Sequence, residues 1–466
     1  MAKVKELVGR HIYLIVTVIL LCMTCLIASI PGIASKIIAV VFFACSVYVG
    51  VKLVYRKWSP EVVFHMFMDG YVIFRLPGLL YHKDTFFAFF EARHGIQDWS
   101  RADIVMRKGQ LLGSEVKWGP VQVVAHDDNY RCANPVPIID RETNTIMVIF
   151  ILLVPGTRCC DFIGKKFDQK INIVKSTDWG ETWSREDITD CVLGSSDASF
   201  YASGPGHGIQ LKSGRLVVPG KFNLKPEASQ KASRLNTCDH SMIIYSDDHA
   251  ETWTRGGHVP YHEDGYLRAI HTCEATILEL QENQLCMNSR TLHPEHPRAQ
   301  AFSYDGGLKF EPPQLPGNLV EQAYNECGYV NPARGGAPGC QGSLLGFPAP
   351  RITSSTQQMA PLIETHQTWA LFSNPATRYL RFKMGIRLSK DGCQNWSKPW
   401  TIWRMASGYS DMAFISNPQE AGEEQEGQVQ KAPSRESHEL KFGILFESGL
   451  FFSGRLYPLL CLMQRK

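Results

Sequence analysis

Apolar and polar positions follow two different patterns along the chain, and the change comes near residue 60. Before it lie two long apolar runs, 12–30 and 37–55, separated by a Pro31-Gly32 break. From about residue 62 onward, short runs rich in β-branched and aromatic residues are bounded by Gly, Pro, Asn or Asp, without long helical periodicity. We therefore expect an all-β domain over 62–466, whose clearest strand-like runs are 144–154, 214–218, 241–245, 368–372 and 442–446.

The two apolar runs are each close to the length of a transmembrane helix, which needs about 20 apolar residues. Basic residues flank their outer ends, in the N-terminal segment 1–11 and at 52–57. Because cytoplasmic flanks are rich in Lys and Arg, this pattern favours a helical hairpin that leaves the large domain on the cytosolic side of a plasma or endolysosomal membrane. The alternative is that 12–30 is a cleaved signal peptide, which would place the domain in a lumen or outside the cell.

An eight-residue phrase recurs four times in the β-rich part, with Ser first, Asp two residues later and an aromatic residue five after the Asp. We interpret it as a hairpin turn in which the Ser and Asp side chains bind backbone N–H groups and the ring packs beneath the turn. The intervals of 70, 57 and 86 residues between copies fit propeller blades with insertions. The four copies are 176–183, 246–253, 303–310 and 389–396. Ala250 and Cys393 replace a turn glycine in the second and fourth copies, so looser turns are expected there.

Composition narrows the classes of function. The 48 Lys and Arg residues nearly balance the 45 Asp and Glu residues, so the net charge of +3 does not indicate a nucleic-acid partner. Three of the 14 cysteines lie in the apolar runs, and the odd number that remains favours reduced thiols over a complete disulfide framework. Cys22-x-x-Cys25 lacks a second pair, so no metal site is predicted. The polar segment 417–439 is predicted to be a disordered insertion.

Several short motifs accompany the repeats: Phe74-Arg75-Leu76-Pro77, Asn134-Pro135-Val136-Pro137, Gly204-Pro205-Gly206-His207 and Gly339-Cys-Gln-Gly-Ser343. Together with the repeats they resemble animal sialidases, from about Val72 to Met463. The resemblance implies a six-bladed β-propeller and an exo-alpha-sialidase that needs no cofactor or metal. It further implies that the substrate is a sialylated glycolipid, such as a ganglioside, or a glycoprotein or oligosaccharide, and membrane lipid is the other expected partner.

Sialic acid carries a carboxylate on its anomeric carbon, and arginine binds a carboxylate through two parallel hydrogen bonds. The resemblance implies three such arginines, Arg75, Arg290 and Arg381, with Arg378 and Arg387 as alternatives to the last. It also implies that Arg93 contacts the carboxylate side of the sugar or the substituent at carbon 4. Two further residues are implied in the site, namely Asn134 as a substrate contact and Glu447 as the acid that pairs with Arg75.

The resemblance assigns catalytic roles as well. Asp98, five residues after Arg93, is implied to be the acid/base that protonates the leaving oxygen. A tyrosine nucleophile avoids the repulsion that a carboxylate would meet at this anomeric carbon, but its pKa of about 10 requires a base beside it. The resemblance implies Tyr409 as nucleophile and Glu274 as base, with Glu279 and Glu263 as alternatives to Glu274.

Two other functions stay open at this point. A sialic-acid-binding propeller without catalysis, a lectin, would retain the arginines but would have no need of the catalytic set. A structural scaffold for protein partners would need neither. The segment 221–225 lacks the tyrosines that some cytosolic sialidases place around the glycerol side chain of the sugar, so the resemblance does not extend to specificity.

Overall fold

The chain divides into two compact units, Met1–Glu61 and Val62–Lys466, and nearly all of the described residues belong to the second. The predicted segments 1–11, 12–30, 37–55 and 417–439 lie outside the described residues. Within the described part, no helix has the length and apolar character needed to cross a membrane. The structure, a computed structural model, describes residues 61–113, 115–157, 168–194, 198–224, 239–262, 270–293, 296–322, 339–349, 368–378, 380–415 and 441–448, and the backbone of 451–452, 455–456 and 459–465.

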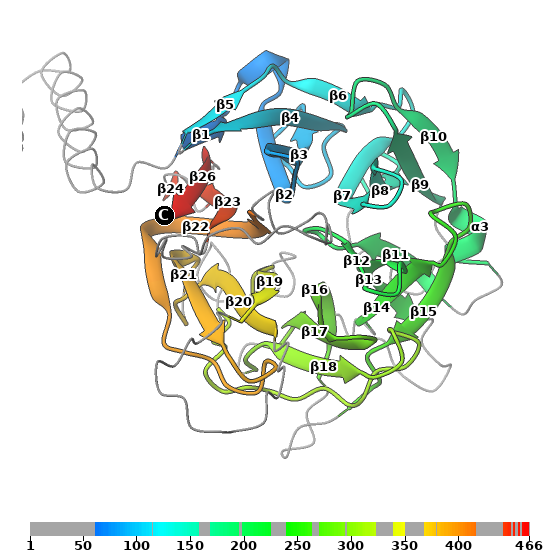
Figure 1. Cartoon of the computed structure of the whole chain (residues 1–466). Helices are drawn as coiled ribbons and strands as arrows, with labels where there is room; N and C mark the ends of the chain where they lie inside the picture. Colours follow the sequence, from blue (N-terminus) through cyan, green and yellow to red (C-terminus); the bar gives the residue numbers. More distant parts are fainter. Residues whose placement is uncertain are drawn as a thin grey trace, which may run out of the picture. The chain divides into compact units, whose positions relative to one another are not determined.

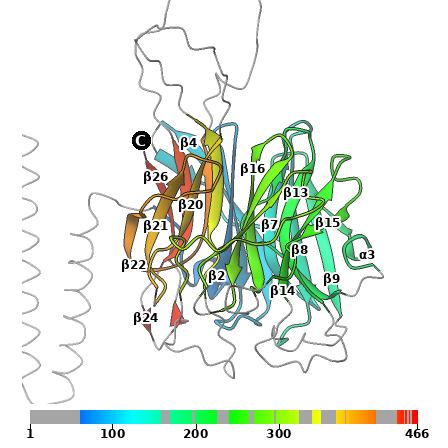
Figure 2. The ribbon, with the colours of Figure 1, turned by 90° about the horizontal axis from the view of Figure 1, so that it is seen from below.

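Antiparallel sheets follow one another in chain order around a ring in the second unit (Figure 1), and Figure 2 shows their strands running alongside one another. The first sheet contains β2 (Ile73–His82), β3 (Thr85–Arg93), β4 (Ala102–Leu112), β5 (Glu115–Trp118) and β6 (Gln122–Ala125). The second contains β7 (Arg131–Asp140), β8 (Thr145–Leu153), β9 (Gln169–Ser176) and β10 (Ser184–Asp187). The third contains β11 (Ala198–Ser203), β12 (Ile209–Gln210), β13 (Leu216–Leu224), β14 (Asp239–Ser246) and β15 (Thr254–His258).

The remaining strands complete the ring. The fourth sheet contains β16 (Thr272–Gln281), β17 (Gln284–Thr291) and β18 (Ala299–Ser303). The fifth contains β19 (Ser343–Pro348), β20 (Thr368–Pro375), β21 (Phe382–Ser389), β22 (Trp400–Phe414), β23 (Phe442–Ser448), β26 (Leu459–Arg465) and β1 (Glu61–Phe64). A small sheet pairs β24 (Phe451–Phe452) with β25 (Arg455–Leu456), and the helical turns of the described part are η1 (Met68–Gly70) and α3 (Thr189–Val192).

The all-β propeller-like fold expected from the sequence is confirmed, but the expected number of six blades is wrong for the described strands, which form five sheets of three or more strands. The reason lies in the 15-residue strand β22. Its first half pairs with β21, from Trp400 to Ala406, and its second half pairs with β23, from Ser407 to Phe414. The single strand β22 therefore joins the strands on the β21 side and those on the β23 side into one seven-stranded sheet.

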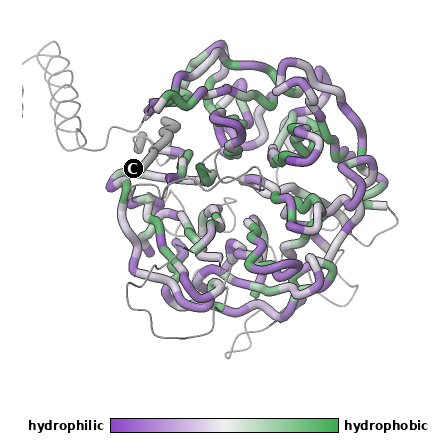
Figure 3. Tube along the Cα trace, viewed as in Figure 1, coloured by the Kyte–Doolittle hydropathy of each residue, from purple (hydrophilic) through white to green (hydrophobic). Residues whose placement is uncertain are grey.

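The strand β8 shows why the apolar run 144–154 is continuous rather than alternating. Its odd-numbered residues belong to an apolar cluster shared with β13 and β14, whereas its even-numbered residues belong to one shared with β3 and β4. Neighbouring sheets thus cover both of its faces, and full burial of each such side chain contributes about 1.5–3 kcal/mol. Other apolar stretches are distributed around the ring (Figure 3).

The four repeats are turns with one shared set of hydrogen bonds. In each, the Ser hydroxyl donates to the Asp carboxylate at 2.7–2.9 Å and accepts the N–H of the residue four positions later at 2.7–3.0 Å. The predicted burial of the aromatic residue is confirmed in three of the four turns, with exposed fractions of 3 %, 2 % and 6 % for Trp253, Phe310 and Trp396, whereas Trp183 in the first turn is only partly buried.

The looser turns expected at Ala250 and Cys393 are not found. Both residues adopt the left-handed φ, 68° and 67°, that glycine has at the matching positions Gly180 and Gly307, and both keep the bond to the Ser hydroxyl. A left-handed conformation costs a residue other than glycine about 1–3 kcal/mol. The hydrogen bonds and the buried position of these residues offset that cost, so the turn keeps its shape without glycine.

Candidate active site

Several of the predicted site residues lie near the ends of paired strands in different sheets. In the first sheet, Arg75 near the start of β2 is opposite Glu91 near the end of β3. In the fourth sheet, the start of β16 is likewise opposite the end of β17, with Thr272 facing Thr291. Because paired antiparallel strands bring the start of one beside the end of the next, Arg75 and Glu91 lie side by side near one end of the first sheet.

Tyr409, Glu274 and Arg290 form a closed triangle of hydrogen bonds. The Tyr409 hydroxyl donates to Glu274 Oε1 at 2.5 Å, and Arg290 Nη1 donates both to Glu274 Oε2 at 2.7 Å and to the Tyr409 oxygen at 3.0 Å. These residues come from β22, β16 and β17, more than a hundred residues apart at the extremes. A phenol, a carboxylate and a guanidinium group are thus hydrogen-bonded to one another in the site.

The electrostatics of this triangle favour an ionised glutamate beside a protonated phenol. Burial, reinforced by the charge of Glu274, raises the pKa of Tyr409 well above its usual value. Burial would also raise the pKa of Glu274, but the positive charge of Arg290 and the hydrogen bond from Tyr409 outweigh it and lower that pKa. Glu274 is therefore ionised and can accept the proton of Tyr409, although both pKa shifts oppose that transfer in the empty site.

Two further arginines face the ring of Tyr409. The guanidinium carbons of Arg75 and Arg381 each lie 5.5 Å from the centre of the phenol ring. Together with Arg290 they surround Tyr409 with three positive charges, which is the arrangement that an anionic ligand requires.

Three of the four alternatives that the sequence left open lie elsewhere. Arg387 is buried and donates to Asn374 at 2.8 Å, and Arg378 is exposed. Glu279 accepts the backbone N–H groups of Lys212 and Asn283 near the far end of β16. Glu263 lies outside the described residues. Geometry therefore favours Arg381 and Glu274 as members of this site.

Glu447 holds the first arginine and the tyrosine together. Its side chain is 1 % exposed, and its Oε1 accepts Arg75 Nε at 2.7 Å and the N–H of Leu76 at 3.1 Å. Its Oε2 accepts the N–H of Tyr409 at 3.2 Å. Leu76 has a left-handed φ of 61° in the bulge that follows Arg75, which turns its N–H toward this carboxylate.

Asp98 and Arg93 form an ion pair beside Arg75. Arg93 Nη1 donates to Asp98 Oδ1 at 2.5 Å, and Arg75 Nη1 lies 3.6 Å from the same oxygen. The Asp98 side chain is 73 % exposed, so a substrate can reach it. Desolvation by nearby protein atoms would raise the pKa of Asp98, but the charges of Arg93 and Arg75 outweigh it and hold that pKa well below its usual range.

Glu91 is a site residue that the sequence reasoning did not single out. It is fully buried, accepts Arg93 Nε at 2.6 Å and also accepts the N–H of Asn134 at 3.2 Å. Asn134 has a left-handed φ of 56° and donates from its amide to the Ser203 carbonyl. Because residues two apart on a strand share a face, the spacing of Glu91 and Arg93 was a usable signal. All nine predicted site residues thus belong to one group of contacts.

Comparison with known proteins agrees with this geometry. The profile described as "BNR repeat-like domain" matches residues 84–421. Sialidase-3 of Mus musculus is 31 % identical over 386 residues, covering 74 % of this chain and 85 % of that protein. Sialidase-4 of Homo sapiens is 29 % identical over 479 residues, covering 84 % and 90 % respectively. Among solved structures, Hadza microbial sialidase Hz136 superposes with a TM-score of 0.64 at 21 % identity, covering 88 % of this chain and 68 % of that one.

These matches, on a propeller that gathers arginines around a buried phenol, define a glycoside hydrolase of the exo-alpha-sialidase class. The family match extends over most of the chain, and the mouse relative aligns along most of its own length. The chain belongs to the sialidase family, in its animal branch. The resemblance expected from the sequence motifs is thereby confirmed.

Proposed function

We propose that this protein removes terminal sialic acid from glycoconjugates by a retaining mechanism with Tyr409 as the nucleophile. The observation that carries the proposal is the 2.5 Å hydrogen bond from the Tyr409 hydroxyl to the ionised Glu274, set among three arginines. A neutral nucleophile with a base beside it suits a carbon that already bears a carboxylate.

Arg75, Arg290 and Arg381 bind the substrate carboxylate in this proposal. All three lie against Tyr409, so an anion that they hold places the anomeric carbon near the phenol oxygen. Arg93 and Asn134, joined through Glu91, lie on the Asp98 side, where they contact the substituents of the ring. Glu447 does not touch the substrate but holds Arg75 in place.

The reaction proceeds in two balanced halves. In the first, Asp98 gives its proton to the leaving oxygen as that oxygen separates from the anomeric carbon. The Tyr409 oxygen bonds to the carbon and passes its proton to Glu274. In the second half, water attacks the same carbon, Asp98 accepts a proton from the water, and Tyr409 leaves with the proton that Glu274 returns. Two inversions at one carbon give overall retention.

The arginines beside Asp98 predict an acidic optimum. Asp98 must be protonated to act as an acid, yet Arg93 and Arg75 hold its pKa below the usual range in the empty site. The protonated fraction falls as pH rises through and above that pKa, so kcat/KM decreases toward neutral pH. A substrate carboxylate bound to Arg75 weakens this effect of the arginines, which raises the pKa of Asp98 when substrate is present.

Replacing Asp98 with asparagine is expected to slow two substrates unequally. With sialyllactose, whose leaving oxygen needs a proton, kcat should fall about 10²–10⁴-fold, the usual contribution of a general acid. With a phenolic sialoside, whose leaving group departs without a proton, the loss should be much smaller. Steady-state kinetics on both substrates give the ratio. An equal loss on both would exclude Asp98 as the acid.

The function itself is tested with the purified full chain in detergent, by release of sialic acid from a fluorogenic sialoside between pH 3.5 and 7.5. Turnover that is greatest at acidic pH is the expected result. If the protein binds sialic acid but shows no turnover across this range, the non-catalytic lectin replaces the enzyme as the function.

Membrane attachment and glycolipid substrates are part of the proposal. The uncharged run 12–30 and the second run 37–55 support a hairpin anchor with the propeller on the cytosolic side, and an anchored enzyme meets gangliosides readily. A tag at the C-terminus should then resist protease in intact cells and become sensitive after detergent. Digestion in intact cells would instead support the cleaved signal peptide and an outward-facing domain.

A further inference from the structure

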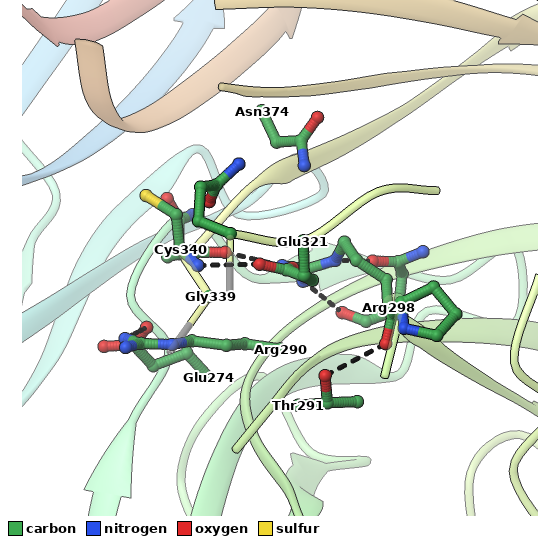
Figure 4. Close-up of polar contacts among 12 residues, drawn as sticks. Glu274, Arg290, Thr291, Arg298, Glu321, Gly339, Cys340 and Asn374 are labelled. Carbon is green, nitrogen blue, oxygen red and sulfur yellow. Dashed lines mark hydrogen bonds and ion pairs between the residues drawn. The ribbon is translucent and has the colours of Figure 1, made fainter. Parts of the chain in front are cut away.

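A buried ion pair lies beside the site and contacts none of the proposed catalytic groups. Arg298, just before β18, is fully buried, and its Nη1 donates to Glu321 Oε1 at 2.6 Å (Figure 4). Glu321 has a side chain that is 3 % exposed. Arg298 also donates to the side chain and the carbonyl of Asn288, and its guanidinium carbon lies 5.0 Å from the centre of the Phe372 ring.

Both members of the pair form hydrogen bonds with the same short backbone segment, Gly339-Cys340. Glu321 Oε2 accepts the N–H of Cys340 at 2.8 Å, and Arg298 Nη1 donates to the Cys340 carbonyl at 2.7 Å. The N–H of Gly339 donates to the carbonyl of Gln322 at 2.8 Å. One charged pair thereby binds the donor and the acceptor of a single peptide residue, which fixes the position of this segment.

The segment fills the space between two of the arginines. Gly339 has a left-handed φ of 77°, and a Cβ built on it would lie 2.7 Å from Glu321 Oε2 and 3.0 Å from Arg290 Cγ. The Gly339 carbonyl accepts Arg381 Nη2 at 3.0 Å. Cys340 packs with Leu76 and Tyr409 in a small apolar cluster. The segment thus contacts Arg381, Tyr409 and the stem of Arg290 at once.

We propose that Arg298 and Glu321 are positioning residues for catalysis, which act through Gly339-Cys340 to set the guanidinium of Arg381 and the ring of Tyr409. The inference rests on the proposed function, since it names the residues that hold the side chains of that site in position. Two buried charges are costly to desolvate, and a well-packed apolar pair would often be as stable. Because both charges bind the backbone of Cys340 at the site, the pair has a positioning role that an apolar pair could not fill.

The test compares Glu321→Gln with the double variant Arg298→Met/Glu321→Met in the full chain. Glu321→Gln leaves the Arg298 charge without its partner, so both stability and positioning should suffer. The methionine pair removes both charges, so the denaturant midpoint should recover. Methionine cannot bind the N–H or the carbonyl of Cys340, however, so KM for the sialoside should stay raised, on the order of tenfold or more, in both variants.

Asp140→Asn is the matched control. Asp140 is also fully buried and binds His249 and Gln210. It lies at the far end of β7, about 20 Å along the strand from the site residue Asn134. This variant should lower the denaturant midpoint and leave KM unchanged, because partial unfolding reduces the amount of active enzyme without altering its affinity.

The outcomes separate the two proposals. A raised KM in both site variants, with an unchanged KM in the control, supports positioning by the pair. A wild-type KM in the folded double variant overturns the positioning of Arg381, and an unchanged kcat in that variant overturns the positioning of Tyr409. If the wild-type chain itself shows no turnover, the proposed function fails instead.

Discussion

Replacing Tyr409 with phenylalanine is expected to lower kcat by about 10⁴-fold or more, which is the scale on which enzymes lose rate when a nucleophile is removed. Phenylalanine keeps the buried ring, its contacts with Leu76 and Cys340 and the backbone N–H that binds Glu447. Only the oxygen that would bond to the anomeric carbon is lost. Binding of sialic acid, measured by calorimetry, should therefore change far less than turnover.

Tyr201→Phe provides the matched control. Tyr201 is fully buried, and its hydroxyl has no hydrogen-bond partner among the described residues. Loss of that oxygen should leave both folding and turnover near the wild-type values. If Tyr409→Phe retained turnover within a factor of about ten, while Tyr201→Phe behaved as expected, Tyr409 could not be the nucleophile.

The second large effect is expected for Arg75→Lys, which should raise KM by about 100-fold. Lysine keeps the positive charge but offers no planar fork, so it cannot bind Glu447 and a substrate carboxylate at the same time. Loss of one partner in a buried, hydrogen-bonded charge pair costs about 2–5 kcal/mol, and 100-fold lies within that range. Steady-state kinetics on a fluorogenic sialoside give KM directly.

Arg215→Lys controls for the general effect of this substitution. Arg215 forms the same kind of forked contact, from Nε and Nη2 to Asp247 at 2.7 and 2.9 Å, but in a turn remote from the site. Its replacement should leave KM unchanged. A KM for Arg75→Lys within about twofold of wild type would show that Arg75 does not bind the substrate carboxylate.

Much of the fold can be predicted from the sequence because its determinants are local. The Ser, the Asp and the aromatic residue of each repeat make their contacts within a few residues, as Ser176 and Asp178 do. The number of separate sheets depends instead on where a strand stops. Nothing in the sequence between Trp400 and Phe414 indicates that one strand pairs with two different neighbours.

The site divides in a similar way. Arg75, Asp98 and Tyr409 stand in recognisable motifs, so they could be named before the structure was known. Arg298 and Glu321 stand in none, because their importance comes from a residue that is distant in sequence, Cys340. Glu91 lies between these cases, since its spacing of two residues from Arg93 was visible in the sequence although its bond to Asn134 was not.

The contact between Arg75 and Glu447 joins residues separated by 372 positions. The ribosome therefore synthesises a further 372 residues after Arg75 before this arginine meets its acid. A nascent or C-terminally truncated chain that lacks Glu447 has no carboxylate to share between Arg75 and the backbone of Tyr409. In the proposed mechanism, the pairing of β23 with β22 is therefore what brings the carboxylate that orients Arg75 into the site.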